Sequence, residues 1–318
     1  MSSRKKPKRI ENSNSWVTEM VDILFAGTGA SVPSRERSLP CIAVRIKGNI
    51  ILFDCGEGSQ RQLMMSPFSF MKIRGIFVSH MHGDHFLGIP GLLQTMNMSG
   101  RKDKLTLAGP EGFSDAIASL LKMCGGGLNY EIDVKDAKDG DIFAFKGYSI
   151  EAFSVDHGIP ALGFAFREDD RQGRFDREKA MSLGLQPGPD FSKLQEGKKV
   201  KGVDPKDVIG PERKGRVIVY SGDTMPCGRL LNVSKNADVL IHEATYLSKD
   251  HKLAKEHLHS TAKDAASLAK DADAGLLVVT HMSNRYDDLS LIEEECRSVF
   301  PNSIAATDML TLSVKPRV

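Results

Sequence analysis

Four side chains of types that commonly bind metal ions occur within six residues of this chain. The segment His80-Met-His82-Gly-Asp84-His85 directly follows an apolar stretch, Ile73–Ser79, which has the composition of a buried β-strand. Histidines two positions apart on an extended backbone point to the same side and can bind one ion. Asp84 and His85 follow the turn at Gly83 and can face a second ion. Imidazole and carboxylate suit zinc best, although manganese and iron also accept such ligands.

Several other apolar stretches also end on a histidine or an aspartate. Their polar ends are Asp156-His157 after Ile150–Val155, Asp223 after Arg216–Tyr220, and His281 after Gly275–Thr280. Taken singly, each of these residues is more simply interpreted as a structural histidine or a capping aspartate. Their shared place at strand ends predicts one polar site at the edge of a rigid sheet.

The composition is that of a folded protein without membrane or secretion signals. Of the 318 residues, 41% are hydrophobic and 26% are charged, and this length favours one large domain. No apolar run reaches the roughly 18 residues of a membrane span, and the N-terminus lacks the apolar core of a signal peptide. The five cysteines are scattered, which argues against a disulfide framework and predicts a cytoplasmic location.

The net charge of +2 excludes nucleic-acid binding through overall positive charge, so any such binding must use local basic segments. One such segment lies in residues 1–17, which we predict to be a disordered, solubilising tail rather than an RNA-binding arm. Residues 18–318 are predicted to form a single domain. Within it, residues 166–212 are polar and rich in glycine and proline, and a loop of this length is usually functional or disordered.

Turn and capping residues predict further elements. Gly48-Asn49 joins two β-rich stretches, Cys41–Ile46 and Ile50–Asp54, into a hairpin. Thr261-Ala-Lys-Asp264 resembles a capping box that opens an alanine-rich helix. The remaining predictions are strands at Met20–Ala26, Val239–Ile241 and Ile304–Val314, and helices at Asp176–Leu183, at Asp288–Val299, and from an N-cap at Ser114 to Lys122.

Two ions at the cluster would lower the pKa of a water molecule and neutralise charge on a phosphate oxygen. Cleavage of a phosphodiester also needs an acid that protonates the leaving oxygen. His259, which precedes the alanine-rich helix, is a candidate for that acid, and Glu243 is a candidate for orienting it. His251 and His257 lie in a stretch rich in lysine and glutamate and are interpreted as surface histidines. His242 stays open between a structural and a functional role.

Short motifs occur in a fixed order from about Val21 to Val314. They include Phe53-Asp54-Cys-Gly-Glu-Gly58, Gln60-Arg-Gln62, Phe86-Leu-Gly88, His157-Gly-Ile-Pro160, Ser221-Gly-Asp-Thr224, Thr280-His281 and Ala306-Thr-Asp308. With the histidine cluster, these segments resemble the ribonuclease Z family of tRNA 3′-processing endonucleases, in its short form within the metallo-β-lactamase superfamily. The cluster alone is typical of the superfamily, whereas His242-Glu-Ala-Thr245 and His259-Ser-Thr261 are typical of the tRNA-processing branch.

The resemblance implies a four-layer αββα sandwich, the metallo-β-lactamase fold, with the site at the edge of its two sheets. It also implies two zinc ions per subunit, for which manganese could substitute. The implied ligands are His80, His82 and His157 for one ion, Asp84, His85 and His281 for the other, and Asp223 for both. Asp54 would lie behind these ligands. The implied catalytic residues are Asp84, His259 and Glu243, with His259 as the proton donor.

The resemblance also gives the polar stretch a function. In this family a flexible arm with a Gly-Pro motif grips the body of the tRNA, and Gly188-Pro189 and Leu194 match that motif. The arm serves the partner subunit's substrate, which implies a homodimer. The implied phosphate contacts on the arm are Lys198, Lys199 and Lys201.

A loop near the N-terminus departs from the family pattern. The family reads Pro-x-Lys-x-Arg-Asn, whereas this chain reads Pro33-Ser-Arg35-Glu-Arg37-Ser38. The basic positions persist and the asparagine does not. Arg35 and Arg37 are therefore predicted to bind phosphate, while recognition of a CCA end is left open.

The predicted activity is cleavage of precursor tRNA after the discriminator nucleotide, which leaves a 3′-hydroxyl. The alternative is a phosphodiesterase, arylsulfatase-like hydrolase or lactonase of the same fold that acts on small molecules, which would have no use for the arm. A di-iron oxidoreductase of this fold would carry glutamate in place of His82 and would add a flavin domain. A silent RNA-binding protein is disfavoured because every expected ligand position is filled.

Overall fold

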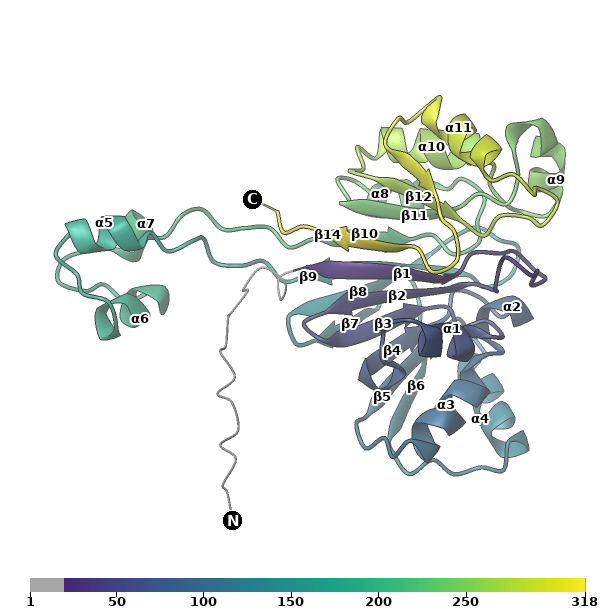
Figure 1. Cartoon of the computed structure of the whole chain (residues 1–318), viewed down its shortest axis with the longest axis horizontal. Coiled ribbons are helices and arrows are strands. Elements are labelled where there is room, and N and C mark those ends of the chain that lie inside the picture. Colours follow the sequence, from purple (N-terminus) through teal and green to yellow (C-terminus); the bar gives the residue numbers. More distant parts are fainter. Residues whose placement is uncertain (1–19, 318) are drawn as a thin grey trace, which may run out of the picture.

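Two seven-stranded sheets pack face to face, and helices cover the outer face of each sheet (Figure 1). This computed structural model describes residues 20–317, so the predicted basic tail at residues 1–17 lies outside the described part of the chain. The expected four-layer αββα sandwich is present. Within residues 20–317, no helix has the length and apolar character needed to cross a membrane.

The first sheet has the order β14-β1-β2-β3-β4-β5-β6. Its strands are β14 (Thr311–Val314), β1 (Val21–Gly27), β2 (Cys41–Ile46), β3 (Asn49–Phe53), β4 (Ile73–Phe77), β5 (Leu105–Gly109) and β6 (Ile132–Asp136). The predicted hairpin is confirmed as β2 and β3, while β3 to β6 run parallel. The helices on its outer side are α1 (Ser59–Met65), α3 (Ile89–Met98) and α4 (Phe113–Met123).

The second sheet has the order β13-β12-β11-β10-β9-β8-β7. Its strands are β13 (Ser303–Ala305), β12 (Leu277–Thr280), β11 (Val239–Glu243), β10 (Val217–Tyr220), β9 (Leu162–Glu168), β8 (Tyr148–Ser154) and β7 (Ile142–Phe145). Its outer helices are α8 (Gly228–Val233), α10 (Ala262–Asp271) and α11 (Ser290–Arg297). β10 to β13 run parallel, so their carboxyl ends meet at one edge of the sheet.

Aromatic side chains fill the space between the two sheets. The ring of Phe53 on β3 stacks on Phe164 of β9 at 5.8 Å and on Tyr220 of β10 at 5.7 Å between centroids. All three side chains are almost fully buried. Because these rings join strands of both sheets, the two strand edges that carry the polar residues are held rigidly against each other.

The helix starts test two predictions about capping. Thr261 and Asp264 form the expected capping box at the start of α10. The N-cap predicted at Ser114 is wrong, because α4 begins after Gly112 and Ser114 lies inside its first turn. The Asp136 carboxylate at the end of β6 accepts hydrogen bonds from the backbone N–H groups of Gly112 and Ser114. A residue distant in sequence therefore caps this helix.

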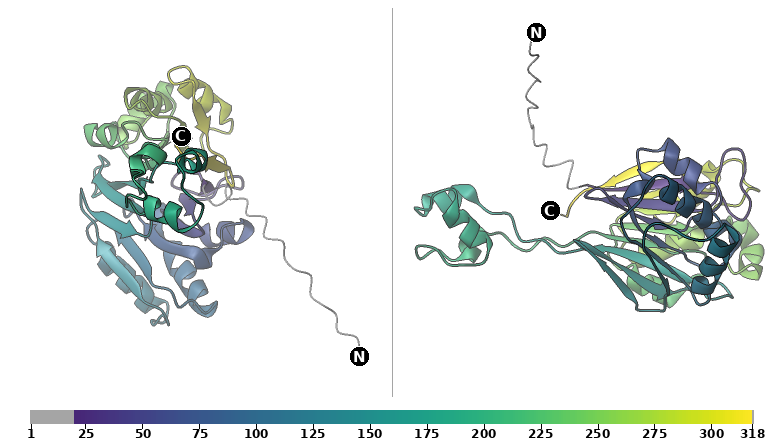
Figure 2. Two further views of the ribbon diagram at one scale, coloured as in Figure 1. Left: turned by 90° about the vertical axis from the view of Figure 1, so that its left-hand side faces the viewer. Right: turned by 90° about the horizontal axis from the view of Figure 1, so that it is seen from below.

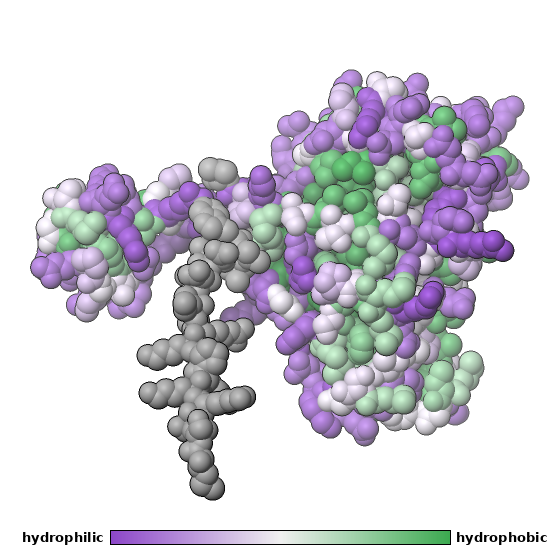
Figure 3. All heavy atoms as spheres, in the orientation of Figure 1, coloured by the Kyte–Doolittle hydropathy of each residue, from purple (hydrophilic) through white to green (hydrophobic). Residues whose placement is uncertain are grey.

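The polar stretch of the sequence forms an arm between β9 and β10, which projects from the body (Figures 1 and 2). Its tip holds three short helices, α5 (Arg177–Ser182), α6 (Pro189–Gln195) and α7 (Pro205–Val208). Asp176 caps α5, and this helix confirms the one predicted at Asp176–Leu183. A small apolar core lies at the centre of the tip, and hydrophilic residues surround it (Figure 3). The buried members of that core are Ala180, Leu185, Phe191, Leu194, Val200, Val203 and Val208.

Candidate metal centre and active site

The seven predicted metal ligands converge at one edge of the sandwich. Each one follows a strand of the body: β4 precedes the cluster, β8 precedes His157, β10 precedes Asp223 and β12 precedes His281. Asp84 and His85 lie in α2 (Gly83–Phe86), a single helical turn that follows His80 and His82. The prediction that these strand ends meet rested on their pattern alone, and the structure brings them together.

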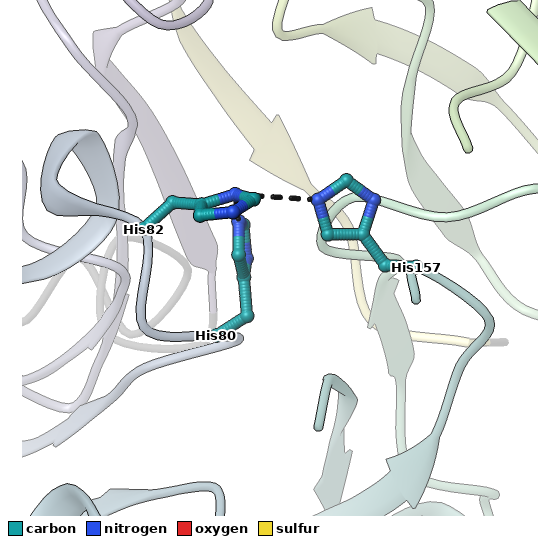
Figure 4. A group of neighbouring side chains, drawn as sticks. All are labelled: His80, His82 and His157. Carbon is teal, nitrogen blue, oxygen red and sulfur yellow. Dashed lines mark hydrogen bonds between the residues drawn. The ribbon is translucent and has the colours of Figure 1, made fainter. Parts of the chain in front are cut away.

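Three imidazole rings form the first group of ligands, and they turn toward one another (Figure 4). His82 Nδ1 lies 2.9 Å from His80 Nε2 and 3.4 Å from His157 Nε2. The other ring nitrogens of His80 and His157 have protein partners: Ser79 Oγ lies 3.0 Å from His80 Nδ1, and the carbonyl of Leu258 lies 3.0 Å from His157 Nδ1. This arrangement leaves the facing nitrogens available to a cation.

Asp84, His85 and His281 form the second group, and Asp223 lies between the two groups. Asp223 Oδ2 is 3.2 Å from His281 Nε2, 3.3 Å from His85 Nε2 and 3.7 Å from His80 Nε2. His85 Nε2, His281 Nε2 and Asp223 Oδ1 are buried, and none of them has a hydrogen-bond partner among the described residues. Buried polar atoms of this kind are costly unless something binds them, so this donor set fits a divalent cation.

The ionisation of His80 and Asp223 suits metal binding. Burial and the neighbouring His85 lower the pKa of His80 well below its usual value, which keeps its imidazole neutral. Burial acts to raise the pKa of Asp223, but His281 and His85 outweigh it and hold that pKa well below its usual value. Neutral imidazole and ionised carboxylate are the forms that bind cations. At His85, burial acts to lower the pKa, but Asp223 and Asp54 outweigh it and raise that pKa well above its usual value, so a cation must displace a proton there.

Asp54 holds the ligands from behind, as the resemblance implies. Its carboxylate accepts hydrogen bonds from the Ser79 backbone N–H at 2.7 Å, the Tyr220 hydroxyl at 2.6 Å and His85 Nδ1 at 2.8 Å. When a cation displaces the proton from Nε2 of His85, the hydrogen bond from Nδ1 to Asp54 would keep the Nε2 lone pair facing the site. Asp54 has a φ of 57° and His281 a φ of 53°, an uncommon backbone conformation that here occurs at the site itself.

His259 and Glu243 form a pair beside the metal ligands. His259 Nδ1 lies 2.7 Å from Glu243 Oε1, and the ring of His259 is 5.5 Å from that of His281. Glu243 is buried and also accepts hydrogen bonds from the Thr245 hydroxyl and from the Thr224 backbone N–H. Burial disfavours the charged imidazole, but the Glu243 carboxylate outweighs it and raises the pKa of His259 to about 9. His259 is therefore protonated at neutral pH.

A cavity of about 420 Å³ opens onto the ligands. Besides ligands and His259, its walls include Tyr246, His257 and Arg285, which the sequence did not single out. The Arg285 guanidinium lies 5.0 Å from the centre of the Tyr246 ring. His257 is exposed, as its interpretation as a surface histidine requires, and its ring lies 6.4 Å from that of Tyr246 at the cavity wall. A larger cavity of about 640 Å³, beside Pro110 and Pro160, contains none of the predicted ligands.

The two arginines predicted to bind phosphate have different surroundings. Arg35 is exposed on its loop, as a phosphate contact requires. Arg37 is 8% exposed, and its guanidinium donates hydrogen bonds to the carbonyls of Met282, at 3.2 Å, and Tyr286, at 3.0 Å. The expectation for Arg37 therefore needs correction: its donors fasten the loop to the segment after His281 and are not free for phosphate.

The predicted arm residues lie together at the arm tip, away from the metal ligands (Figure 1). Gly188 has a φ of 117° and directly precedes α6, whose first residue is Pro189. Lys198 Nζ lies 2.8 Å from Glu196 Oε2, and Lys201 Nζ lies 2.8 Å from Asp190 Oδ2. Lys199 is exposed beside them.

Comparisons with known proteins agree with this architecture. Two family models match, one described as anti-Pycsar protein Apyc1 over residues 21–172 and one described as a beta-lactamase superfamily domain over residues 196–282. A ribonuclease Z from Methanosarcina mazei is 47% identical over 305 residues, which cover 94% of this chain and 99% of that protein. A ribonuclease Z from Bacillus licheniformis is 37% identical and covers 93% and 99%. The chain belongs to the ribonuclease Z family.

Solved structures support the same assignment. Human tRNase Z, short form, superposes on this ribonuclease Z family member with a TM-score of 0.68 at 28% identity, covering 92% of this chain and 99% of the human one. The metallo-beta-lactamase fold protein YhfI from Bacillus subtilis, at 15% identity and a TM-score of 0.69, shares the fold. The predictions of family and fold are both confirmed. The clusters of histidine and aspartate indicate that the chain binds divalent metal.

Proposed function

We propose that this chain is a zinc-dependent endoribonuclease that removes the 3′ trailer from precursor tRNA and leaves a 3′-hydroxyl on the discriminator nucleotide. The observation that carries the proposal is the His259–Glu243 pair, which lies against the metal ligands at the wall of one cavity. The family membership identifies the reaction as endonucleolytic cleavage of a phosphodiester. The scattered free cysteines favour a cytoplasmic enzyme.

The ligand set divides naturally between two zinc ions. His80, His82 and His157 would hold one, Asp84, His85 and His281 the other, and Asp223 both. Zinc favours this mixture of imidazole and carboxylate, and manganese also accepts it. When bound, the ions supply an activated water and neutralise charge on the scissile phosphate.

The protein's own residues handle the leaving group. In this cleavage the P–O3′ bond breaks, and the discriminator's 3′-oxygen must gain a proton. His259 can donate it from Nε2, because Nδ1–H is held by Glu243. Thr245 donates its hydroxyl proton to Glu243 at 2.6 Å, which fixes that carboxylate in place. Glu243 thereby keeps His259 both charged and correctly turned.

A direct assay tests the reaction. Purified protein would be incubated with trailer-bearing precursor tRNA, with zinc, with manganese and with a chelator, and both product ends would be mapped. We expect one cut after the discriminator, with a 3′-hydroxyl on the tRNA and a 5′-phosphate on the trailer. Absence of a defined cut near the discriminator would refute the proposal. The variant His82→Ala should still bind tRNA while losing cleavage, and unchanged cleavage would refute the ligand assignment.

The placement of the arm favours a homodimer. In Figure 1, α2 with Asp84 and His85 lies at the right-hand end of the sheets, and the arm leaves from the left-hand end. An arm so placed faces away from its own metal site, and a partner subunit could present its site to the same RNA. Mixing the variant His82→Ala with a variant that lacks the arm tests this assembly. Restored cleavage after subunit exchange supports it, and two inactive components that stay inactive, with a monomeric mass, refute it.

A further inference from the structure

One buried ion pair lies at the place where the arm joins the body. Glu168 is the last residue of β9 and Arg216 directly precedes β10, so the two face each other across the final rung of the ladder. Arg216 donates to Glu168 from Nε at 2.7 Å and from Nη2 at 2.9 Å. Both side chains are 1% exposed. Two parallel hydrogen bonds of this kind fix the relative orientation of the two side chains as well as the distance between them.

The pair also reaches the opposite sheet. Arg216 Nη1 donates to the carbonyl of Val314 at 2.7 Å, and Val314 ends β14 at the edge of the first sheet. The pKa of Glu168 is lowered: burial acts to raise it, but the hydrogen bonds and charge of Arg216 outweigh burial. Glu168 and Arg216 thus connect both sheets to the two strands that lead into the arm.

Beyond this pair, the two strands of the arm form a hydrogen-bonded stalk, which we define as residues 169–175 and 209–215. Arg171 and Arg213 exchange two backbone hydrogen bonds of 2.8 Å, and the Gly210 N–H donates to the Arg174 carbonyl at 3.0 Å. At Gly173 a Cβ would lie 1.8 Å from the carbonyl oxygen of Gly210, so only glycine permits this close approach. The two strands of the stalk are therefore paired, so the flexibility that the resemblance implies for the arm would arise at its root and not within this ribbon.

Because the stalk is stiff, the geometry at its root determines where the arm tip lies. Six extended residues span about 20 Å, so a rotation of about 15° at the root would move the tip by about 5 Å. When two sites on one protein bind one ligand, the gain from linking them depends on the stiffness of the linker and on how well its reach matches the ligand. An arm that swings freely would forfeit most of that gain.

We infer that Glu168 and Arg216 are positioning residues, which fix the direction of the stalk and thereby the place of the arm tip relative to the metal site. Only the expected effect on catalysis rests on the proposed function, because an RNA bound at both the arm tip and the metal site needs the tip in one position. A purely stabilising pair would lower the stability of the body and would leave the tip position of the folded protein unchanged.

The principal test variant is the double substitution Glu168→Gln/Arg216→Met, which removes both charges of the buried pair together. Arg171, whose Nη2 lies 3.7 Å from Glu168 Oε2, keeps an amide oxygen at that position in the variant. Gly173→Ala is the second variant, since it disturbs the stalk without touching the buried pair. Glu151→Gln is the matched control: it removes the ion pair that Glu151 on β8 forms with Arg167, the neighbour of Glu168 on β9, and leaves the buried root pair in place. Circular dichroism and thermal melting would select the folded variants.

The first readout is the tip position, which needs no RNA. Spin labels at Ser182→Cys on α5 and Ser99→Cys on the body, in a background without Cys124 and Cys227, would be diluted with unlabelled protein. We expect a narrow distance distribution for the wild-type stalk and for Glu151→Gln, and a broad or displaced one for both test variants. An unchanged distribution in a folded double variant would overturn the inference, whatever the substrate proves to be.

The second readout is catalytic. For the double variant we expect the KM for precursor tRNA to rise about tenfold or more, as lost linkage between two binding sites predicts. We expect kcat, and all constants for a nitrophenyl phosphodiester, to stay within about twofold, because the metal site is untouched. A wild-type enzyme that cuts no precursor tRNA would contradict the proposed function. A wild type that cuts it, with an unchanged KM in the double variant, would contradict the positioning role alone.

Discussion

The metal site and the arm are built in opposite ways. At the site, every ligand follows a strand of the body, and buried groups such as Asp54 and Glu243 turn the imidazole rings. In the arm, helices of six, seven and four residues enclose a small apolar core. Isolated helices need roughly 12 residues or more to be stable in water, so the arm depends on that core and on its root. The whole sandwich makes the site rigid, whereas the rigidity of the arm depends on its own small core and on its root.

This difference predicts two kinds of defect. Changes at the metal site should affect the chemistry of every substrate, because the site processes any phosphodiester that reaches it. Changes in the arm should affect only substrates large enough to touch it. Comparing a precursor tRNA with a small nitrophenyl phosphodiester therefore separates the two regions, and so does the separation of kcat from KM.

The largest effect is expected for Asp223→Ala. The carboxylate lies between both ligand groups and is the shared member of each proposed metal site. Its loss should lower kcat/KM by about 10³-fold or more for both substrates, since the charge stabilisation of a metal ion amounts to several kcal/mol. Metal content, measured by mass spectrometry, should fall with it. Asp271→Asn, at an exposed position in α10, is the control. A variant that keeps its metal and cleaves both substrates would contradict the shared role.

A second prediction separates proton donation from metal binding. His259→Ala should lower kcat for precursor tRNA by about 10²–10⁴-fold, the usual contribution of a general acid. The effect on a nitrophenyl phosphodiester should be much smaller, because nitrophenolate leaves without a proton. Unlike an arm defect, this one should appear in kcat and not in KM. Equal losses on both substrates would instead make His259 a structural support of the metal site, and His251→Ala provides the control.

The same pair predicts a pH dependence. The pKa of His259 is raised to about 9, so the protonated donor is present at neutral pH and is lost as the pH rises through that value. The kcat for precursor tRNA should therefore fall on the alkaline side. Glu243→Gln removes the negative charge that favours the imidazolium, so the alkaline limb should move to lower pH. An alkaline limb that stays in place in Glu243→Gln would show that another group titrates there.

The fourth prediction concerns the whole arm. Replacing residues 169–215 by a short glycine-rich turn should raise the KM for precursor tRNA by about 10²-fold, the scale of lost linkage between two binding sites. Activity on the nitrophenyl phosphodiester should persist, because no metal ligand or catalytic residue lies in the arm. If cleavage of precursor tRNA and of the nitrophenyl phosphodiester both persist unchanged, the chain acts on small molecules and the arm does not bind tRNA.

The same contrast shows what could be predicted from the sequence. The convergence of the seven predicted ligands could be predicted because strand-end histidines and aspartates rarely gather in so dense a local motif unless they bind metal. Arg37 was interpreted wrongly, because nothing local shows that its loop folds onto the segment from Met282 to Tyr286. His257 is exposed, as predicted, but nothing local in the sequence shows that it also lines the cavity beside Tyr246.

Long-range pairing accounts for the other misses. Glu168 and Arg216 are 48 residues apart, and nothing in the sequence around either residue predicts that their side chains pair. The cap of α4 comes from Asp136, beyond the helix itself, so the local pattern pointed to Ser114 instead. Periodicity and capping rules describe neighbours in sequence, and these contacts are set by how the sheets bring distant segments together.

The smallest effects are expected at single lysines of the arm tip. Lys198 pairs with Glu196 and Lys201 with Asp190, and both lysines are exposed, so water screens each pair and a phosphate can replace the carboxylate at little cost. Lys198→Ala should weaken tRNA binding only a few-fold and lower the slope of log affinity against log salt by roughly 0.7–0.9. Glu196→Gln removes the competing carboxylate and should strengthen binding slightly. Lys102→Ala on the body should change neither quantity, and a salt slope unaffected by Lys198→Ala would remove that lysine from the RNA contact.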